Sequence, residues 1–161
     1  MTPAELAQHK TAPKRLASAP SFTKLKRGKL PKPFNKMGGD RFHSSGALPV
    51  SDIHRIFAFW RDGETLTDRA FFAWLMCELG NGDLYPLFEF HYHPSHKGVH
   101  GKLPCNTELN YANRQLPQAP ELRLNCQGET DPATVEGRLH LMDRFCRACG
   151  IAQGEGGGLW S

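Results

Sequence analysis

The chain has 161 residues, of which 39% are hydrophobic, and it carries a formal net charge of +4. This length suits a single domain with an extension. No apolar run approaches the roughly 20 residues that a membrane-spanning helix needs, and the N-terminus lacks the apolar core of a secretory signal. The five cysteines are an odd number, which argues against a full disulfide framework and favours a reducing, cytoplasmic setting.

Positive charge is concentrated in the first 48 residues. They hold ten Lys or Arg residues and two acids, whereas the rest of the chain holds ten basic and fourteen acidic residues. Prolines recur here and hydrophobic residues are scattered, so we expect a flexible, disordered basic arm at 1–48. Such cations displace counterions from phosphates, which predicts contact with nucleic acid, and a solvated tail is the alternative. The arm residues expected to bind substrate are Lys24, Lys26, Arg27 and Lys29.

Two amphipathic helices are expected next. In "SDIHRIFAFW" (51–60) and "LTDRAFFAWLMCELG" (66–80), hydrophobic residues recur at helical spacing. Ser51 and Thr67 can cap the two helix starts, and Gly80 suits the left-handed position after a helix. Both segments are rich in aromatic residues, so buried strands are the alternative interpretation.

Residues 84–104 are expected to form a β-hairpin. Apolar and polar residues alternate through "FEFHYH" (88–93), which is the period of a half-buried strand. A turn at 94–97 places His91 opposite His100 and Glu89 opposite Lys102, with apolar residues opposed on the other face. A shift by one residue would mix the two faces, which a one-sided core resists.

The rest of the chain predicts a loop, a helix and a tail. Residues 105–131 show no sustained period, apart from a short strand expected at 121–126. Asp131 followed by Pro132 favours a helix start, and Gly150 favours its end. We therefore expect an α+β domain at 49–152, with two N-terminal helices, a β-hairpin or small antiparallel sheet and a C-terminal helix. A flexible Gly-rich tail is expected at 153–161.

Four of the eight histidines fall between 91 and 100, on or near one face of the expected hairpin. Two opposed imidazoles can work as an acid–base pair near neutral pH, and a neighbouring lysine can stabilise charge on phosphorus. RNA supplies its own nucleophile, the 2′-hydroxyl, so these groups could cleave it without a metal. The expected catalytic residues are Glu89, His91, His93, His100 and Lys102. The further residues expected to contact substrate are His96, Lys97, Asn106, Asn110, Tyr111 and Arg114.

Two other interpretations of these side chains stay open. A hairpin's solvent face needs polar residues, and histidine can fill that role without any function. The second interpretation is metal binding, because the histidine face could bind zinc with Glu89 or Cys105. Cys146 and Cys149 form a C-x-x-C pair that would need Cys126, Cys105 or His140 to complete a structural site. Packing of these thiols in an apolar core competes with that interpretation.

The sequence thus predicts a small nucleic-acid-interacting protein without a cofactor. We expect a histidine-based endoribonuclease of a bacterial toxin or defence type, with RNA favoured over DNA as partner. The alternative is a non-catalytic nucleic-acid- or protein-binding factor of a phage or other mobile element, with a structural zinc. In that case the basic arm would contact the partner, and neither interpretation involves a membrane.

Overall fold

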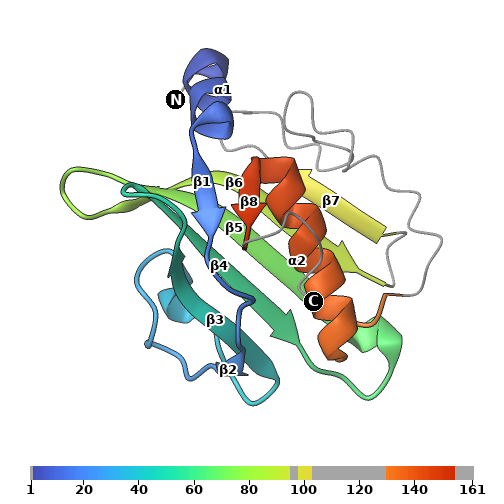
Figure 1. Cartoon of the computed structure of the whole chain (residues 1–161). Coiled ribbons are helices and arrows are strands. Elements are labelled where there is room, and N and C mark those ends of the chain that lie inside the picture. Colours follow the sequence, from blue (N-terminus) through green and yellow to red (C-terminus); the bar gives the residue numbers. More distant parts are fainter. Residues whose placement is uncertain (1, 95–97, 103–129, 155–161) are drawn as a thin grey trace.

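The computed structural model describes residues 2–94, 98–102 and 130–154, with only the backbone considered for 98–102. Its centre is a six-stranded antiparallel sheet whose strands follow one another in chain order (Figure 1). The sheet strands are β2 (Thr23–Lys24), β3 (Phe42–Pro49), β4 (His54–Arg61), β5 (Ala70–Glu78), β6 (Leu84–His93) and β7 (Gly98–Lys102). The other elements are α1 (Pro3–Thr11), β1 (Lys14–Leu16), the 3-10 turns η1 (Phe34–Lys36) and η2 (Leu66–Asp68), α2 (Val135–Cys149) and β8 (Ile151–Gln153). Within the described ranges, no helix combines the length and apolarity needed to span a bilayer.

The predicted α+β arrangement with two N-terminal helices is wrong, because both segments are strands. Residues 51–60 and 66–80 contribute β4 and β5, the two central strands, which are hydrogen-bonded on both sides. Positions 56 to 60 are all buried, since layers cover both faces of β4. A strand buried on both faces is a continuous apolar run, and such a run fits a helical stripe as well as a strand.

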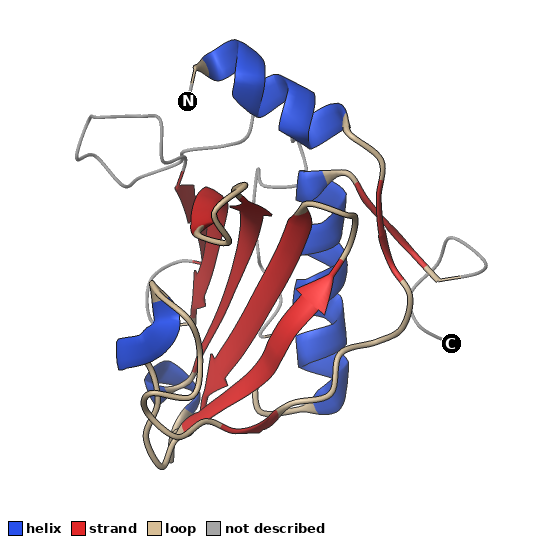
Figure 2. Cartoon of the chain, turned by 90° about the vertical axis from the view of Figure 1, so that its left-hand side faces the viewer, coloured by secondary structure: helices blue, strands red, loops and turns tan. Residues whose placement is uncertain are grey.

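Helix α2 covers one face of the sheet (Figure 2). Its Phe145 ring stacks on Phe88 at 6.4 Å and meets Phe90 edge-on at 6.0 Å, all three fully buried. The predicted C-terminal helix and its stop at Gly150 (φ +64°) are confirmed. The expected N-cap is not, because the Thr134 side chain accepts the hydrogen bond from the Gly137 N–H instead.

The opposite face is only partly covered, by the loop at 25–42. Phe34 is 2% exposed and packs its ring 4.6 Å from Phe57 and 5.3 Å from Phe59. Figure 2 shows this loop and its short η1 turn on the side away from α2. The loop lies over β3, β4 and part of β5, and the rest of that face carries the polar residues of β6.

The expected disordered arm is also wrong for the described residues. Helix α1 begins with a capping box between Thr2 and Glu5, and β1 pairs in parallel with β8 at the other end of the chain. Leu6 and Leu16 are buried in the same core as α2. The sequence signal was misleading because single hydrophobic residues here each fill a separate place in the fold and form no periodic stripe.

Candidate histidine site on the open sheet face

The β6–β7 hairpin has the register that its alternation predicts. His91 pairs with His100, Glu89 with Lys102 and His93 with Gly98. Residues directly opposed on antiparallel strands lie on the same face, with Cβ atoms about 4.5–5.5 Å apart. The register therefore brings two histidines together, beside an acid and a lysine.

The pairing continues across the whole sheet as one row of opposed residues. Thr23 pairs with Ser44, which pairs with Phe59. Phe59 pairs with Phe72, Phe72 pairs with His91, and His91 pairs with His100. Because directly paired residues share a face, the row crosses all six strands on the side away from α2. It is buried under Phe34 at Phe59 and reaches partly exposed side chains at Phe72 and His91.

His91 sits between an acid and two aromatic rings. Its Nε2 lies 3.4 Å from Oε2 of Glu89, with 26% of the His91 side chain and 18% of the Glu89 side chain exposed. The ring meets Phe72 edge-on at 5.2 Å and Trp74 at 5.4 Å. Such contacts hold an imidazole in a defined orientation while leaving part of it open to solvent.

His93 is the second described imidazole on this face. Its ring centroid lies 6.3 Å from that of His91 and 5.3 Å from that of Phe72, and the side chain is partly exposed. Phe72 therefore touches both histidines.

The aromatic members of the site, Phe72 and Trp74, were missed as functional candidates. The expected helix at 66–80 assigned Phe72 to its apolar stripe and gave Trp74 no role, whereas β5 turns both away from the α2 core. In the structure, the partly exposed residues 72 and 74 alternate with the buried residues 71, 73 and 75, although all five are apolar in the sequence "FFAWL". That alternation becomes visible only once the segment is known to be a strand.

Several predicted contacts lie outside the described residues. This holds for the hairpin-tip and loop positions His96, Lys97, Asn106, Asn110, Tyr111 and Arg114, and for Cys105 and Cys126. The predicted arm cations Lys24, Lys26, Arg27 and Lys29 lie at the other end of the sheet, around β2. They are ordered and exposed there, so the fold separates them from the histidines along the row.

The C-x-x-C pair lies in the α2 core and not at a surface site. Cys146 and Cys149 are fully buried, and burial raises the pKa of Cys146 to about 12. Burial likewise raises the pKa of the Cys149 thiol well above its ordinary value. Zinc binds thiolates, so these surroundings favour packing over coordination. Within residues 2–94 and 130–154, no three His, Cys, Asp or Glu side chains gather as a metal site would require.

A second group of histidines lies at the N-terminal end of β4. His54 is 1% exposed, and its Nε2 lies 3.0 Å from Nδ1 of His9 on α1. Its Nδ1 lies 2.7 Å from the hydroxyl of Ser51, which also accepts hydrogen bonds from the N–H groups of Ile53 and His54. Burial lowers the pKa of His54 to about 4, and the nearby Lys14 charge is the next largest cause. The buried, neutral His54 ring contacts His9 and thereby connects α1 to the sheet, which is a structural role.

Comparisons of the chain with protein-family models, with curated proteins and with solved structures returned no significant match. A function for this protein has to be inferred from its own residues and their geometry.

Proposed function

We propose that this protein is a metal-independent endoribonuclease whose catalytic groups lie on the open face of the β6–β7 hairpin. The observation that carries the proposal is the register that opposes His91 and His100, next to the opposed Glu89 and Lys102. Imidazoles on two opposed residues can reach either side of one phosphodiester group. A substrate would reach the exposed part of the His91 ring, since 26% of that side chain is exposed, whereas its Nε2 is buried beside Glu89.

The proposed reaction uses the 2′-hydroxyl of RNA as the nucleophile. One imidazole takes the proton of that hydroxyl, and the 2′-oxygen attacks the adjacent phosphorus. The bond from phosphorus to the 5′-oxygen breaks, and the other imidazole donates a proton to the departing oxygen. The products are a 2′,3′-cyclic phosphate and a 5′-hydroxyl end. Acid–base work of this kind contributes about 10²- to 10⁴-fold to a rate.

The neighbouring charged groups have supporting roles in this scheme. Glu89 contacts the His91 ring and would hold its orientation through the reaction. Lys102 is opposite Glu89 in the register and would stabilise the additional negative charge on the phosphoryl oxygens in the transition state. His93, beside His91, would contact the base or phosphate that follows the cleaved bond.

A second function, binding without cleavage, is favoured by the aromatic rings of the same face. Phe72 and Trp74 are half-buried and lie within 6.1 Å of one another, centroid to centroid. Bases of a single strand stack on such rings, with about 1–3 kcal/mol lost per base when one is replaced by alanine. This function would need the rings and the charge of the face, but neither histidine.

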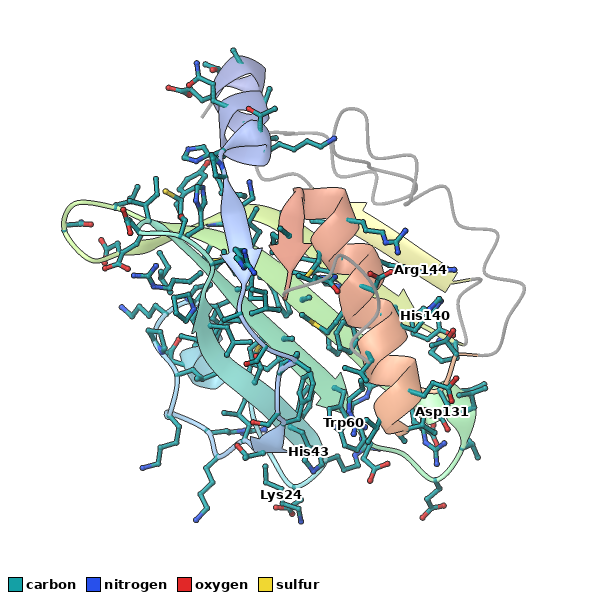
Figure 3. The ribbon with its side chains drawn as sticks, in the orientation of Figure 1. Lys24, His43, Trp60, Asp131, His140 and Arg144 are labelled. Atoms are coloured by element: carbon teal, nitrogen blue, oxygen red, sulfur yellow. The ribbon has the colours of Figure 1, made fainter. Side chains whose placement is uncertain are left out.

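The test is cleavage of a 5′-labelled single-stranded RNA, with the matching DNA and an RNA carrying one 2′-deoxynucleotide as comparisons. We expect cleavage of RNA alone, unchanged by EDTA, with 2′,3′-cyclic phosphate ends and none at the 2′-deoxy position. His91→Ala and His100→Ala should each lower the rate at least about 100-fold. His140→Ala is the matched control, because this half-buried histidine lies on α2, which covers the opposite face of the sheet (Figure 3), and it should keep full activity.

Three outcomes would contradict the proposal. Full activity in both hairpin variants would remove the histidine pair from the chemistry. Cleavage that EDTA abolishes would transfer the histidines to a metal site. Tight RNA binding without any cleavage would leave the binding function in place of the nuclease.

A further inference from the structure

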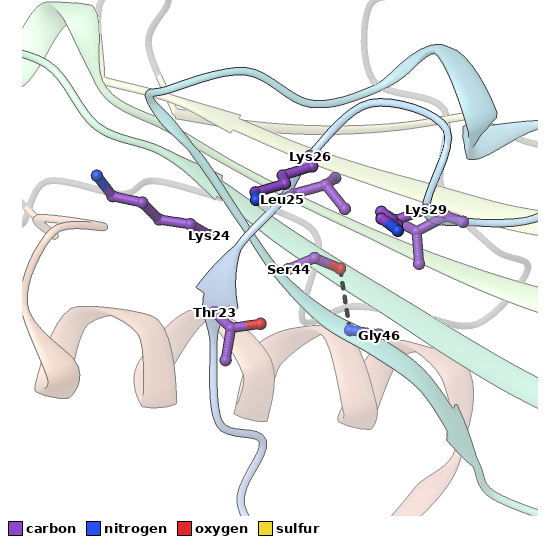
Figure 4. Close-up of a pocket in the computed structure, with 8 residues that line it drawn as sticks. Thr23, Lys24, Leu25, Lys26, Lys29, Ser44 and Gly46 are labelled. Carbon is purple, nitrogen blue, oxygen red and sulfur yellow. Dashed lines mark hydrogen bonds between the residues drawn. The ribbon is translucent and has the colours of Figure 1, made fainter.

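A lysine-lined pocket lies at the β2–β3 edge of the sheet. Its volume is about 330 Å³, and Figure 4 shows its lining residues. The pocket is lined by Thr23, Lys24, Leu25, Lys26, Lys29 and Leu30 of one chain segment, and by Ser44 and Gly46 of β3. None of these residues is acidic. Lys24 is paired with His43, and its ammonium points away from those of Lys26 and Lys29 (Figure 4). The pocket therefore offers two ammonium groups and two hydroxyls above an apolar floor.

The segment that carries the lysines is held in place by the fold. The Gly39 N–H donates to the Leu25 carbonyl, and the Gly28 N–H donates to the Asn35 carbonyl, both at 3.0 Å. Gly38, at φ +133°, lies so close to the backbone of residues 25–27 that a Cβ there would overlap it. With Phe34 buried below, this loop presents its cations from a fixed backbone, which lowers the entropy cost of binding an anion.

The three lysines are not neutralised within the described structure. All three side chains are exposed, and no ion pair found among the described residues involves them. On the β3 side, the Ser44 hydroxyl accepts a hydrogen bond from the Gly46 N–H at 2.9 Å, which fixes its position in the pocket wall (Figure 4). Exposed ammonium groups without acids among the lining residues attract phosphate.

The pocket and the histidines lie on the same face of the sheet. Ser44 in the pocket wall belongs to the row of opposed residues that leads through Phe59 and Phe72 to His91. Ser44 and His91 are three strands apart, so the strand spacing puts their backbones about 14 Å from each other. The loop that covers the row between them also carries the exposed cations Arg27, Lys32 and Lys36. A single nucleic-acid strand of a few nucleotides spans such a distance.

We propose that the lysine pocket binds backbone phosphates of the same RNA strand whose scissile bond lies at the histidine pair, several nucleotides away. This inference rests on the proposed function. It assigns the protein a substrate longer than the cleaved dinucleotide, running across the β-strands from the β2 edge to the hairpin. It also predicts sequence-independent affinity, because the pocket's cations and hydroxyls recognise phosphate and not bases.

The experiment compares the wild-type chain with a variant carrying Lys26→Ala and Lys29→Ala. Binding is measured with a 12-nucleotide 2′-O-methyl RNA, which cannot be cleaved, at several salt concentrations. Cleavage is measured on a 12-nucleotide RNA and on an RNA dinucleotide. The control removes the same charge on the other side of the sheet, through Arg144→Ala and Arg147→Ala on α2. Melting curves check that each variant is folded.

We expect the pocket variant to bind the 12-mer about 10- to 100-fold more weakly at 0.1 M salt. The slope of log K against log salt should shrink by about 1.4, since each of the two single-strand phosphate contacts contributes about 0.7. Cleavage of the dinucleotide should stay at the wild-type rate, and the control variant should keep the wild-type slope.

An unchanged affinity and slope in the pocket variant would overturn the inference. So would an equal loss of dinucleotide cleavage, because the lysines would then act at the chemistry. If the wild-type chain cleaves nothing but binds RNA with this lysine dependence, the nuclease proposal fails and the pocket stands. If it binds no RNA, both fail.

Discussion

The two faces of the central sheet are built from the same strands but are covered by different elements. On the α2 side, aromatic and aliphatic residues of β4, β5 and β6 pack under a full helix and are buried. On the other side, the 25–42 loop covers only the first half of the sheet. The uncovered half presents rings, histidines and an acid to solvent. The contrast indicates that stability comes chiefly from the helix-covered face, and that polar and aromatic side chains reach solvent on the partly covered face.

The histidines follow the same division. His54 lies at the start of β4, is almost fully buried and bonds to His9 and Ser51. His91 and His93 are partly exposed at the far end of the row, beside Phe72. The sequence does not distinguish the buried histidine from the partly exposed ones, whereas the burial of each side chain in the structure does.

The largest expected effect contrasts two neighbours on β5 that point to opposite faces. Phe71 is fully buried on the α2 side, whereas Phe72 is half-buried beside His91. Phe71→Ala should lower the free energy of unfolding by about 3–5 kcal/mol, because it leaves a cavity in the core. Phe72→Ala should cost less than half of that and should weaken binding of single-stranded RNA instead.

Urea unfolding followed by tryptophan fluorescence and filter binding with 2′-O-methyl RNA would measure the two effects. Equal losses of stability, or an RNA affinity that only Phe71→Ala reduces, would show that the two faces do not divide in this way.

A second prediction concerns how closely the start of α2 packs against the backbone of Asp131. A Cβ at Gly137 would overlap the carbonyl oxygen of Asp131, whose carboxylate pairs with Arg69 at 2.6 Å. Alanine is the better helix former by about 1 kcal/mol, yet we expect Gly137→Ala to destabilise the protein by about 1–3 kcal/mol. Thermal unfolding beside Val135→Ala, an exposed position on the same turn, gives the comparison. A Gly137→Ala variant as stable as the control would mean that α2 can shift on this face.

The third prediction uses the buried histidine. The pKa of His54 falls from 6.5 to about 4 on folding, through burial first and then through Lys14, His9 and Arg55. The unfolded chain therefore binds more protons than the folded one between these values. This stabilisation is complete above pH 6.5 and is lost as pH falls towards 4, by on the order of 2 kcal/mol.

Urea unfolding at pH 5 to 7 would measure this loss, and His54→Gln should flatten the profile in that range. NMR titration of the folded protein would follow the ring directly. A His54 midpoint near 6.5 would contradict its assignment to the structural, buried group.

The sequence alone determined the hairpin and the C-terminal helix. Strict alternation in "FEFHYH" leaves one register in which apolar residues oppose apolar residues, and the backbone adopts that register. The helix over 135–149 was predicted by its stripe and by Gly150, although its N-cap proved to be Thr134. In both cases one face is buried and the other is not, so a local pattern records the environment.

Only the tertiary structure decided the remaining fold and the extent of the site. β4 is buried on both faces and β5 carries apolar residues on both faces, which removes the alternation that distinguishes a strand from a helix. The first 48 residues hold their places through isolated contacts such as Leu6, Leu16 and Phe34, and each depends on a partner far away in the chain. The row from Ser44 to His91 joins four strands in one line. Such a line exists only in the register between strands, because its members are separated in sequence and meet through long-range pairing.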